Sequence, residues 1–367
     1  MDSFADDLRY MRLALDLGRR GLGNAWPNPA VGAVIVNDGV IVGRGWTQPG
    51  GRPHAETEAL RRAGEAATGA TLYVTLEPCS HHGKTPPCAD AVIAAGISRV
   101  VAALEDPNPE VAGQGLARLR EAGIEVETGL CEEGARRAHA GHIRRIRDGR
   151  PHVTLKLAVS ADGKSGLAGR RPVQISGEVA RARVHMMRAM NDAVLIGIGT
   201  ALADQPLLTC RLPGLQKRSP VRVVLDSKLR LPVEHSLVET ARETPLWVIA
   251  APDAPVDKEK ALREAGVEVV RSGRGEGGLD LKRALSALGE KGVSRLLVEP
   301  GPILAASLLK AELIDEAVVI RSPAALGAAA IDAIEGLPLK ALTDSLKFRI
   351  AAQDKLGADQ LTVYERI

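Results

Sequence analysis

The chain has 367 residues, which is enough for two or three domains with a hydrophobic core in each. Charged residues make up 25% and hydrophobic residues 45% of the sequence, and these globular values exclude a disordered or fibrous protein. The 48 Lys and Arg residues against 45 Asp and Glu leave a net charge of +3, too balanced for a protein that coats nucleic acid. With only 3 Trp, 3 Tyr and 2 Phe, no aromatic platform for single strands is expected either.

Cysteine usage and the N-terminal residues indicate the cellular compartment. The four cysteines are too few to hold a secreted protein of this length together by disulfides. The N-terminus lacks the basic and apolar regions of a signal peptide, and no apolar run reaches the roughly 18 residues of a membrane span. We therefore expect a cytoplasmic protein without a membrane partner.

The first part of the chain is predicted to alternate helices and strands. Apolar spacing predicts a helix over residues 4–15. Residues 31–36 and 40–42 predict a β-hairpin, because the Asp38-Gly39 pair between them supplies the positive φ that a tight turn needs. The remaining elements predicted here are helices at 53–60, 89–95 and 115–122, and strands at 71–76, 100–104 and 124–128. This alternation is typical of an α/β domain.

A domain boundary is predicted at residues 141–151, where the alternation is lost and charge, glycine and proline gather. After it, strands are predicted at 153–157, 193–196, 221–225, 246–249, 267–270 and 296–298, with helices between most of them. The glycine-rich residues 271–278 are interpreted as an exposed loop. The predicted fold class is therefore α/β with two domains, residues 1–146 and 151–367.

A metal-binding constellation lies in the first domain. His54 and Glu56 open a predicted helix, and Cys79 and Cys88 frame a polar loop. One imidazole, two thiols and one unbound carboxylate are the inventory of a hydrolytic zinc site that keeps a coordination position for water. Glu56 is expected to carry protons without binding the metal, and the helix that follows Cys88 favours a thiolate there.

Each part of this constellation also has a simpler interpretation. A His-x-Glu pair is usually exposed on a helix, and isolated cysteines are often small buried hydrophobes. The combination, with Pro78 before Cys79, favours metal binding. The loop between the thiols carries His81, His82 and Lys84, which can contact a pyrimidine or a phosphate; either histidine can instead be another ligand or plain surface.

Four motifs make this domain similar to a known family. They read GNAWPNPAVGAVIVNDGVIVGRGWTQPGG at 23–51, PHAE at 53–56, EPCSHHGKTPPC at 77–88 and EDPNP at 105–109. They resemble the deaminase half of the RibD family, whose members are bifunctional enzymes of riboflavin biosynthesis. The resemblance implies a cytidine-deaminase-like fold that removes the ring amino group of 2,5-diamino-6-ribosylamino-4(3H)-pyrimidinone 5′-phosphate.

The resemblance also implies roles for individual residues of this domain. Zinc ligation falls on His54, Cys79 and Cys88, and proton transfer falls on Glu56. The implied substrate contacts are Asn28, His81, Lys84, Asp106 and Asn108. Where the family commonly has Gly-Trp-His, this chain ends the motif with Thr47, so we expect a polar substrate contact to be lost or replaced there. Neither Cys131, beside two glutamates, nor Cys210 is expected to be catalytic.

The second domain carries weaker signals for anion binding. Lys156 lies on a strand that leads into an Asp-Gly turn, where a lysine can hold an anion or polarise a carbonyl. Residues 197–200 follow another strand and allow close backbone approach to a ligand. Arg188 and Arg211 can bind phosphate, and the helix predicted from residue 303 has an N-terminus that suits an anion. Each signal alone also fits an ordinary solvated surface.

Three motifs connect these signals. They read LKLAVSADGK from Leu155, HMMRAMNDAVLIGIGTALADQPLLTCR at 185–211 and LLVEPGPILAASLL from Leu296, and they resemble the reductase half of the same family. The resemblance implies a dihydrofolate-reductase-like fold and NADPH-dependent reduction of the phosphoribosyl group to a ribityl chain. The implied NADPH contacts are Val159, Gln174, Thr200, Asp204, Ser227, Gly301, Pro302, Ile303, Leu304, Ala305, Ala306 and Ser307. The implied substrate contacts are Lys156, Arg188, Leu208, Arg211 and Glu299.

Two departures from the family lie in this second domain. Residues 172–176 read Pro-Val-Gln-Ile-Ser where the family often has Ser-x-Trp-Ile-Thr, which removes a substrate-binding serine and a tryptophan expected to pack on the cofactor. Pro300 replaces a small residue and deletes a backbone N–H next to the expected phosphate loop, although proline near a helix start is generally tolerated.

The predicted function is a two-step enzyme with zinc and NADPH as cofactors. Its predicted partner is a small phosphorylated pyrimidine, with no nucleic acid and no membrane, and we expect a homo-oligomer. Three alternatives remain: a nucleic-acid base deaminase, a purely structural zinc site with His81 or His82 as fourth ligand, and a deaminase whose C-terminal half is not catalytic.

Overall fold

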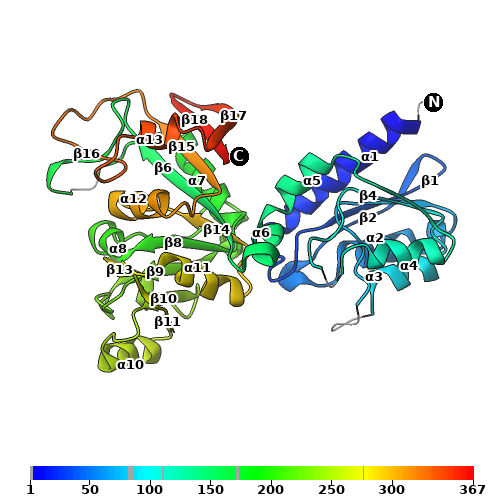
Figure 1. Cartoon of the computed structure of the whole chain (residues 1–367), viewed down its shortest axis with the longest axis horizontal. Coiled ribbons are helices and arrows are strands. Elements are labelled where there is room, and N and C mark those ends of the chain that lie inside the picture. Colours follow the sequence, from blue (N-terminus) through cyan, green and yellow to red (C-terminus); the bar gives the residue numbers. More distant parts are fainter. Residues whose placement is uncertain (1–2, 82–85, 110, 171–172, 276) are drawn as a thin grey trace. The chain divides into compact units, whose positions relative to one another are not determined.

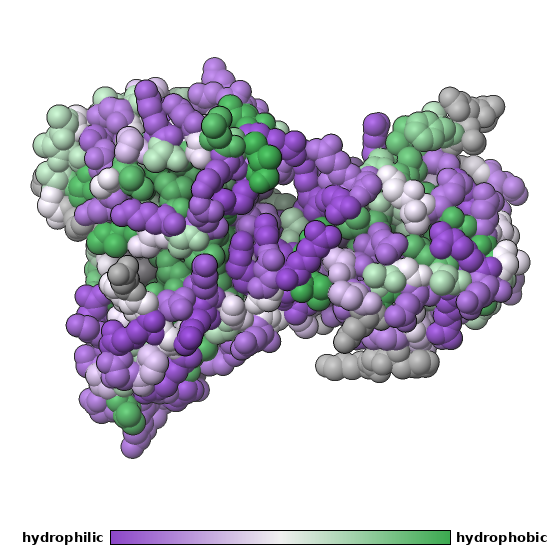
Figure 2. Space-filling view, viewed as in Figure 1, coloured by the Kyte–Doolittle hydropathy of each residue, from purple (hydrophilic) through white to green (hydrophobic). Residues whose placement is uncertain are grey.

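The computed structural model describes residues 3–81, 86–109, 111–170, 173–275 and 277–367. It divides into two compact units, Met1–Gly149 and Arg150–Ile367, each built around its own sheet (Figure 1). No helix within the described ranges is long and apolar enough to cross a membrane. On the face drawn in Figure 2, polar and charged residues cover much of both units, with apolar residues scattered between them.

The first unit contains a five-stranded sheet with the order β2-β1-β3-β4-β5. Strands β3, β4 and β5 are parallel, whereas β1 is antiparallel to both β2 and β3. Helices α1 and α5 cover one face of the sheet, and α2, α3 and α4 cover the other (Figure 1). The strands are β1 (Gly32–Asn37), β2 (Val40–Trp46), β3 (Thr71–Val74), β4 (Arg99–Ala102) and β5 (Glu125–Thr128). The helices are α1 (Ser3–Gly18), α2 (Ala55–Ala63), α3 (Cys88–Ala94), α4 (Gln114–Glu121), α5 (Glu132–Ala138) and α6 (Ala140–Asp148).

The β1–β2 hairpin confirms the turn predicted from sequence. Asn37 pairs with Val40, and the two residues between them have positive φ values of 47° at Asp38 and 76° at Gly39. Positive φ at both central residues matches the right-handed twist of the flanking strands. The hairpin starts β1 beside the end of β3, which brings residues before β1 close to the metal-binding motif.

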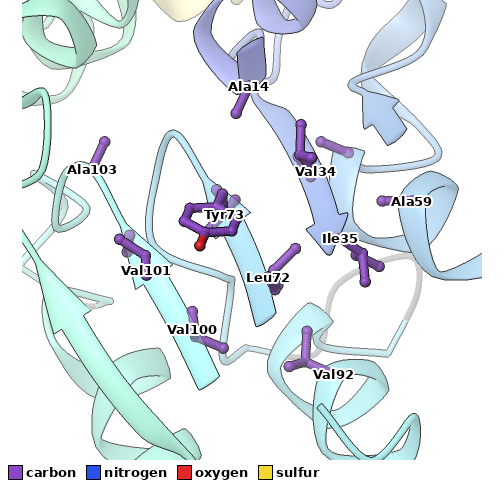
Figure 3. Close-up of a cluster of buried hydrophobic side chains, with 14 of the residues drawn as sticks. Ala14, Val34, Ile35, Ala59, Leu72, Tyr73, Val92, Val100, Val101 and Ala103 are labelled. Carbon is purple, nitrogen blue, oxygen red and sulfur yellow. The ribbon is translucent and has the colours of Figure 1, made fainter. Parts of the chain in front are cut away.

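Both faces of this sheet are buried by small and branched side chains (Figure 3). Neighbouring strands place Ile35, Leu72 and Val100 on one face, and Val34, Tyr73 and Val101 on the other. The Tyr73 ring packs against α1, and its hydroxyl donates a hydrogen bond to the Asp7 carboxylate. Arg99 binds the same carboxylate in a bidentate pair, with N–O distances of 3.1 and 2.7 Å.

Residues 141–148, where the sequence predicts a break in the regular alternation, belong instead to helix α6. His142 is buried on this helix, Ile143 packs against the core, and Arg144 pairs with Asp148 one turn later. The charge in this segment therefore lies on a solvated helix face. The helix ends at Gly149, which adopts a left-handed φ of 66°.

The second unit contains a nine-stranded sheet with the order β11-β10-β9-β8-β14-β6-β15-β18-β17. All neighbours from β11 to β15 are parallel, and β18 and β17 add an antiparallel edge. The strands are β6 (His152–Val159), β8 (Ala193–Gly197), β9 (Val221–Leu225), β10 (Leu246–Ala250), β11 (Glu268–Arg271), β14 (Arg295–Val298), β15 (Glu316–Arg321), β17 (Phe348–Leu356) and β18 (Asp359–Arg366). The helices are α7 (Glu178–Ala189), α8 (Ile198–Asp204), α9 (Ser236–Glu239), α10 (Val256–Glu264), α11 (Leu281–Glu290), α12 (Pro302–Lys310) and α13 (Lys340–Thr343).

Some strands of this unit are not predicted from sequence. Residues 271–278, interpreted above as a loop, contribute to a small antiparallel pair between β12 (Arg274–Gly275) and β13 (Gly278–Leu279). A second small pair joins β7 (Lys164–Gly166) and β16 (Ile331–Asp332). Strand β17 is largely exposed along its length, so its sequence has no continuous apolar run to mark it.

In both units, parallel strands bring separate loops to one edge of the sheet. In the first unit, Val74 pairs with Ala102, so the segments that follow β3 and β4 leave the sheet together. In the second unit, β8, β14 and β6 are adjacent and parallel. Ligand sites in α/β proteins lie outside such carboxyl ends, and both candidate sites of this chain are found there.

Candidate active sites

Three metal-ligating side chains converge in the first unit. One donor atom from each of His54, Cys79 and Cys88 lies within 4.8 Å of the others. The Nδ1 atom of His54 lies 3.2 Å from the Cys88 sulfur and 3.7 Å from the Cys79 sulfur. Two sulfurs and one imidazole nitrogen form a donor set that zinc prefers, and three protein ligands are typical of a hydrolytic zinc site. The residues present therefore fit a zinc ion.

Secondary structure positions each of these ligands. His54 is the N-cap of α2, and Cys88 is the first residue of α3. Cys79 follows β3, and its sulfur accepts the backbone N–H of Cys88 at 3.3 Å. The Asn28 amide nitrogen lies 3.2 Å from Nε2 of His54 and donates to the Gly51 carbonyl at 2.9 Å. Asn28, predicted as a substrate contact, thus also fixes the His54 ring so that Nδ1 faces the two sulfurs.

Glu56, which the sequence predicts to transfer protons, is buried beside these three residues on the first turn of α2. Glu56 is only 3% exposed. This burial raises the pKa of its carboxyl group to about 7, although the nearby charge of His54 acts to lower that pKa. A carboxyl with a pKa near neutrality can both accept and return a proton at physiological pH. Glu56 is not among the three converging residues.

The two thiols differ in their pKa values. The pKa of Cys79 is lowered to about 4, chiefly because the Cys88 thiol donates to its sulfur. The same hydrogen bond, together with burial, raises the pKa of Cys88. The sequence predicts that the α3 N-terminus favours a Cys88 thiolate, but the first N–H of this helix is directed at Cys79.

The other predicted substrate contacts of this domain are only partly brought together. Oδ1 of Asp106 accepts the backbone N–H of Asn108 at 2.9 Å and lies 3.3 Å from Nε2 of His142 on α6. Burial raises the pKa of Asp106, but His142 and the surrounding donors outweigh it and the net shift is downward. His81 is exposed and is not part of the converging ligand group. His82 and Lys84 lie outside the described residues.

Thr47, the position where the family commonly has histidine, has a structural role here. It is 2% exposed, its hydroxyl donates to the Pro29 carbonyl at 2.9 Å, and it accepts the Val31 N–H at 3.0 Å. Both partners lie just after Asn28 in the chain. Thr47 therefore supports the loop that orients His54, and its hydroxyl is satisfied by backbone groups.

A large cleft lies at the carboxyl ends of the parallel strands in the second unit. Its volume is about 1480 Å³, above the roughly 300–1,000 Å³ of an ordinary small-molecule pocket, so it has room for a dinucleotide beside a second ligand. A Cβ added to Gly199, in the cleft wall, would meet no atom within 4 Å, so a ligand can approach the backbone there. At Gly301, an added Cβ would lie 2.9 Å from the Thr200 hydroxyl. This open, glycine-lined wall fits NADPH.

A buried charge cluster forms one part of the cleft wall. The Arg188 guanidinium binds both carboxylate oxygens of Glu299, at 2.6 and 3.0 Å, and Lys156 Nζ lies 3.9 Å from the same carboxylate. Burial raises the pKa of Glu299, but the two cations outweigh it and keep the carboxylate ionised. Burial lowers the pKa of Lys156. The cluster holds two cations against one anion, so it suits an additional anionic or polar ligand.

Most of the cofactor and substrate contacts implied by sequence line this cleft, but three do not. Val159, Ala305 and Ala306 are buried in the core, and their side chains do not reach it. Val159 lies on the buried side of strand β6, and Ala305 and Ala306 lie on the buried side of helix α12. The implied residues that do line the cleft are Gln174, Thr200, Asp204, Ser227, Gly301, Pro302, Ile303, Leu304, Ser307, Lys156, Arg188, Leu208, Arg211 and Glu299.

The cleft also contains residues that sequence reasoning did not single out. His185 lies on α7, and its Nδ1 is 3.1 Å from the Thr209 carbonyl oxygen. Arg188 and Arg211 lie nearby. Arg230 and Lys282 add cationic groups to the lining, and Gly275 and Gly278 enter it from the β12–β13 pair. The glycine-rich composition of the β12–β13 segment was the only feature of the sequence that could have indicated its place in the cleft lining. Pro172 lies outside the described residues, whereas Pro300 lines the cleft just before the N-cap of α12.

Together the two sites define a class of protein: a zinc-type deaminase domain joined in one chain to a reductase domain with a dinucleotide-sized cleft. Residues 5–104 match the family described as the cytidine and deoxycytidylate deaminase zinc-binding region. Residues 151–361 match the family described as the RibD C-terminal domain. The chain belongs to the RibD family.

Relatives match over nearly the whole chain. The riboflavin biosynthesis protein RibD of Escherichia coli is 42% identical over 96% of this chain and 97% of its own length. The Aquifex aeolicus RibD is 41% identical over 98% of each chain. The solved structure of Acinetobacter baumannii RibD, form 1, matches with a TM-score of 0.88 and 36% identity over 99% of each chain.

A further solved structure is that of a Thermotoga maritima diaminohydroxyphosphoribosylaminopyrimidine deaminase and 5-amino-6-(5-phosphoribosylamino)uracil reductase. It matches with a TM-score of 0.86 and 34% identity over 100% of each chain. These findings confirm the fold and the bifunctional class predicted from sequence. The protein is a deaminase and reductase of riboflavin biosynthesis, with zinc as the cofactor of the first activity and NADPH as that of the second.

Proposed function

We propose that residues 1–146 release the ring amino group of 2,5-diamino-6-ribosylamino-4(3H)-pyrimidinone 5′-phosphate as ammonia. Residues 151–367 then reduce the product, 5-amino-6-(5-phosphoribosylamino)uracil, with NADPH to the ribitylamino compound. The observation that carries the proposal is the convergence of His54, Cys79 and Cys88 beside the buried Glu56. The name of the Thermotoga maritima enzyme, which specifies a substrate for each activity, supports the choice of substrates.

In the deamination step, the chain binds the pyrimidine and moves protons. A zinc ion held by His54, Cys79 and Cys88 lowers the pKa of a water molecule when bound. Glu56 takes a proton from the attacking water and delivers one to the departing amino group, for which its pKa of about 7 is suited. The residues proposed to contact the pyrimidine phosphate are Asn28, His81, Lys84, Asp106 and Asn108.

In the reduction step, the cleft of the second unit orients the sugar against the cofactor. NADPH supplies a hydride when bound. Glu299 holds Arg188 in place by its bidentate pair, so that Arg188 and Arg211 bind the substrate anion, while Lys156 reaches the same subsite. The proposed NADPH contacts are Gln174, Thr200, Asp204, Ser227, Ser307 and the residues from Gly301 to Leu304.

We also propose that the chain forms a homo-oligomer. Strand β17 is a long, exposed edge of the nine-stranded sheet, and such an edge is a ready surface for pairing with another chain. Light scattering after size-exclusion chromatography measures the molar mass directly. A mass of one chain at micromolar concentration would contradict this part of the proposal.

Separate measurement of the two half-reactions tests the function. Purified protein is incubated with the diaminopyrimidine phosphate, with and without NADPH, and ammonia release and NADPH oxidation are followed independently. We expect ammonia in both cases and NADPH oxidation only after ammonia has formed. Ammonia without NADPH oxidation would contradict the proposed reductase substrate, and NADPH oxidation without ammonia would contradict the proposed order of steps.

A further inference from the structure

A buried carboxylate near the metal ligands has no role in the mechanism above. Glu77 lies two residues before Cys79 and is 4% exposed. Its oxygens accept four backbone N–H groups, and within the described residues no Lys or Arg pairs with it. Oε2 accepts from Asp106 at 3.1 Å and Gly113 at 2.9 Å, and Oε1 accepts from Gly115 at 2.8 Å and Leu116 at 3.3 Å.

These donors belong to two segments that the sequence separates from Glu77. Asp106 lies in the loop after β4 that also carries Asn108, and Gly113 to Leu116 form the start of α4. The N-cap of α4 is Gly113, which has no side chain to cap the helix. The Glu77 carboxylate takes over this function, and its negative charge is stabilised by the positive end of the helix.

Glu77 is also tied closely to the metal-binding loop. Its backbone N–H donates to the Leu104 carbonyl at 2.8 Å, which continues the β3–β4 pairing beyond the strands. A Cβ on Gly115 would lie only 2.0 Å from the Pro78 carbonyl, so the α4 backbone packs directly on the residue before Cys79. One side chain therefore connects the segment holding a metal ligand with the loop holding Asp106 and Asn108.

We propose that Glu77 is a positioning residue for deamination, which sets the Asp106–Asn108 loop relative to the metal ligands. The inference rests on the proposed function, because it assumes that Asp106 and Asn108 contact the pyrimidine phosphate. A glutamine at this position keeps the shape but turns an NH₂ group toward two N–H donors and removes the charge at the α4 N-terminus. The loop then loses its fixed position, while Cys79 stays in place through its own bond from Cys88.

The expected consequence of Glu77→Gln is a change in substrate binding. Because the loop is then held less firmly, we expect the KM for the diaminopyrimidine phosphate to rise roughly tenfold or more. We expect a smaller fall in kcat and an unchanged zinc content per chain, because Glu56 and the ligands are not moved. NADPH oxidation with the already deaminated substrate is expected to match the unaltered protein, since that cleft belongs to the other unit.

A matched control separates positioning from general stability. Asp7 is another buried carboxylate of the same unit, bonded to Tyr73 and to Arg99 at the start of β4, whereas the metal ligands lie beyond the carboxyl ends of the strands. Asp7→Asn is expected to lower the unfolding temperature and leave the KM unchanged. If Glu77→Gln lowers the unfolding temperature in the same way with no rise in KM, its role is structural only and the inference is wrong.

A double-substitution cycle with Asp106→Ala distinguishes this inference from the proposed function. If Glu77 acts through the Asp106 loop, Glu77→Gln raises the KM less in the Asp106→Ala background than alone. Equal effects in both backgrounds would overturn the inference and leave the proposed function standing. If Asp106→Ala alone leaves the KM unchanged, the substrate role of Asp106 fails, and the inference fails with it.

A second variant keeps the test decisive if Glu77→Gln does not fold. Glu77→Asp retains the charge but shortens the side chain by one methylene, so it cannot reach all four donors. We expect an intermediate rise in KM, with zinc retained. A folded Glu77→Asp protein with an unchanged KM would also overturn the inference.

Discussion

The two active sites of this chain are built in opposite ways. The metal site gathers three side chains within 4.8 Å, all from residues 54–88 and all of types that bind zinc. The reductase cleft encloses about 1480 Å³ and is lined by segments from Lys156 to Ile331, many of which contribute backbone or apolar groups. Coordination chemistry demands particular side chains, whereas a cofactor cleft can be made from many, so the first site is visible in the sequence and the second is much less so.

The same comparison holds for two carboxylates, one from each site. Burial dominates at Glu56 and raises its pKa to about 7, so it can exchange a proton. At Glu299, Arg188 and Lys156 outweigh burial and lower the pKa, so the carboxylate stays charged and serves as a fixed anchor. A carboxyl group largely withdrawn from solvent is therefore suited to exchanging protons in one unit and to orienting a cation in the other, depending on whether a cation is paired with it.

The largest predicted effect separates these two roles. Glu56→Gln removes the proton carrier but keeps the shape, so we expect ammonia release to fall by roughly 10²–10⁴-fold. Zinc content is expected to remain unchanged because Glu56 is not a ligand. NADPH oxidation with deaminated substrate serves as the control and is expected to be unaffected. Ammonia release within tenfold of the unaltered protein would show that the zinc site is structural or that another group moves the proton.

The second predicted effect is on the other carboxylate. Glu299→Gln leaves Arg188 and Lys156 without their anion inside the cleft, and breaking a buried pair costs about 3–5 kcal/mol. We expect a lower unfolding temperature for the second unit and a large rise in the KM of the reductase substrate. Calorimetry and the NADPH assay measure these, with ammonia release as the unaffected control. An unchanged unfolding temperature would contradict this prediction, because it would show that solvent stabilises the charges of Arg188 and Lys156 without Glu299.

Local patterns accounted for what the sequence predicted well. The β1–β2 hairpin followed from Asp38-Gly39, and the convergence of His54, Cys79 and Cys88 agrees with the residue types from which a zinc site was predicted. Strand β17 was missed because most of its side chains are exposed, and its pairing depends on the neighbouring strand β18. The role of Glu77 was also invisible, because its four donors come from segments brought together only by the fold. Features that depend on long-range backbone pairing leave little trace in local composition.

A smaller effect concerns a carboxylate that is paired but not catalytic. The Arg99 hydrogen bonds hold the pKa of Asp7 below its usual value of 3.8, even though burial opposes them. A depressed pKa in the folded state contributes stability that is present above about pH 4 and is lost as the pH falls further. Asp7→Asn lacks this contribution, so we expect it to be less stable at pH 7 by about 1–3 kcal/mol, with the difference shrinking below pH 4. Urea unfolding at several pH values measures this, and a difference independent of pH would contradict it.

The smallest predicted effect sharpens the view of the cleft as a backbone-lined site. Pro300 lacks the N–H that most residues would offer to a cofactor phosphate, but it precedes the N-cap Gly301, and helix α12 starts at Pro302. The free donors of a helix N-terminus lie after the N-cap, so an N–H at position 300 is not one of them. Pro300→Ala is therefore expected to change the KM for NADPH by less than about twofold, or roughly 0.4 kcal/mol. A tenfold lower KM for NADPH would instead show that the proline removes a phosphate contact. Gly301→Ala is the matched variant: its Cβ would lie 2.9 Å from the Thr200 hydroxyl, so we expect it to raise the KM for NADPH.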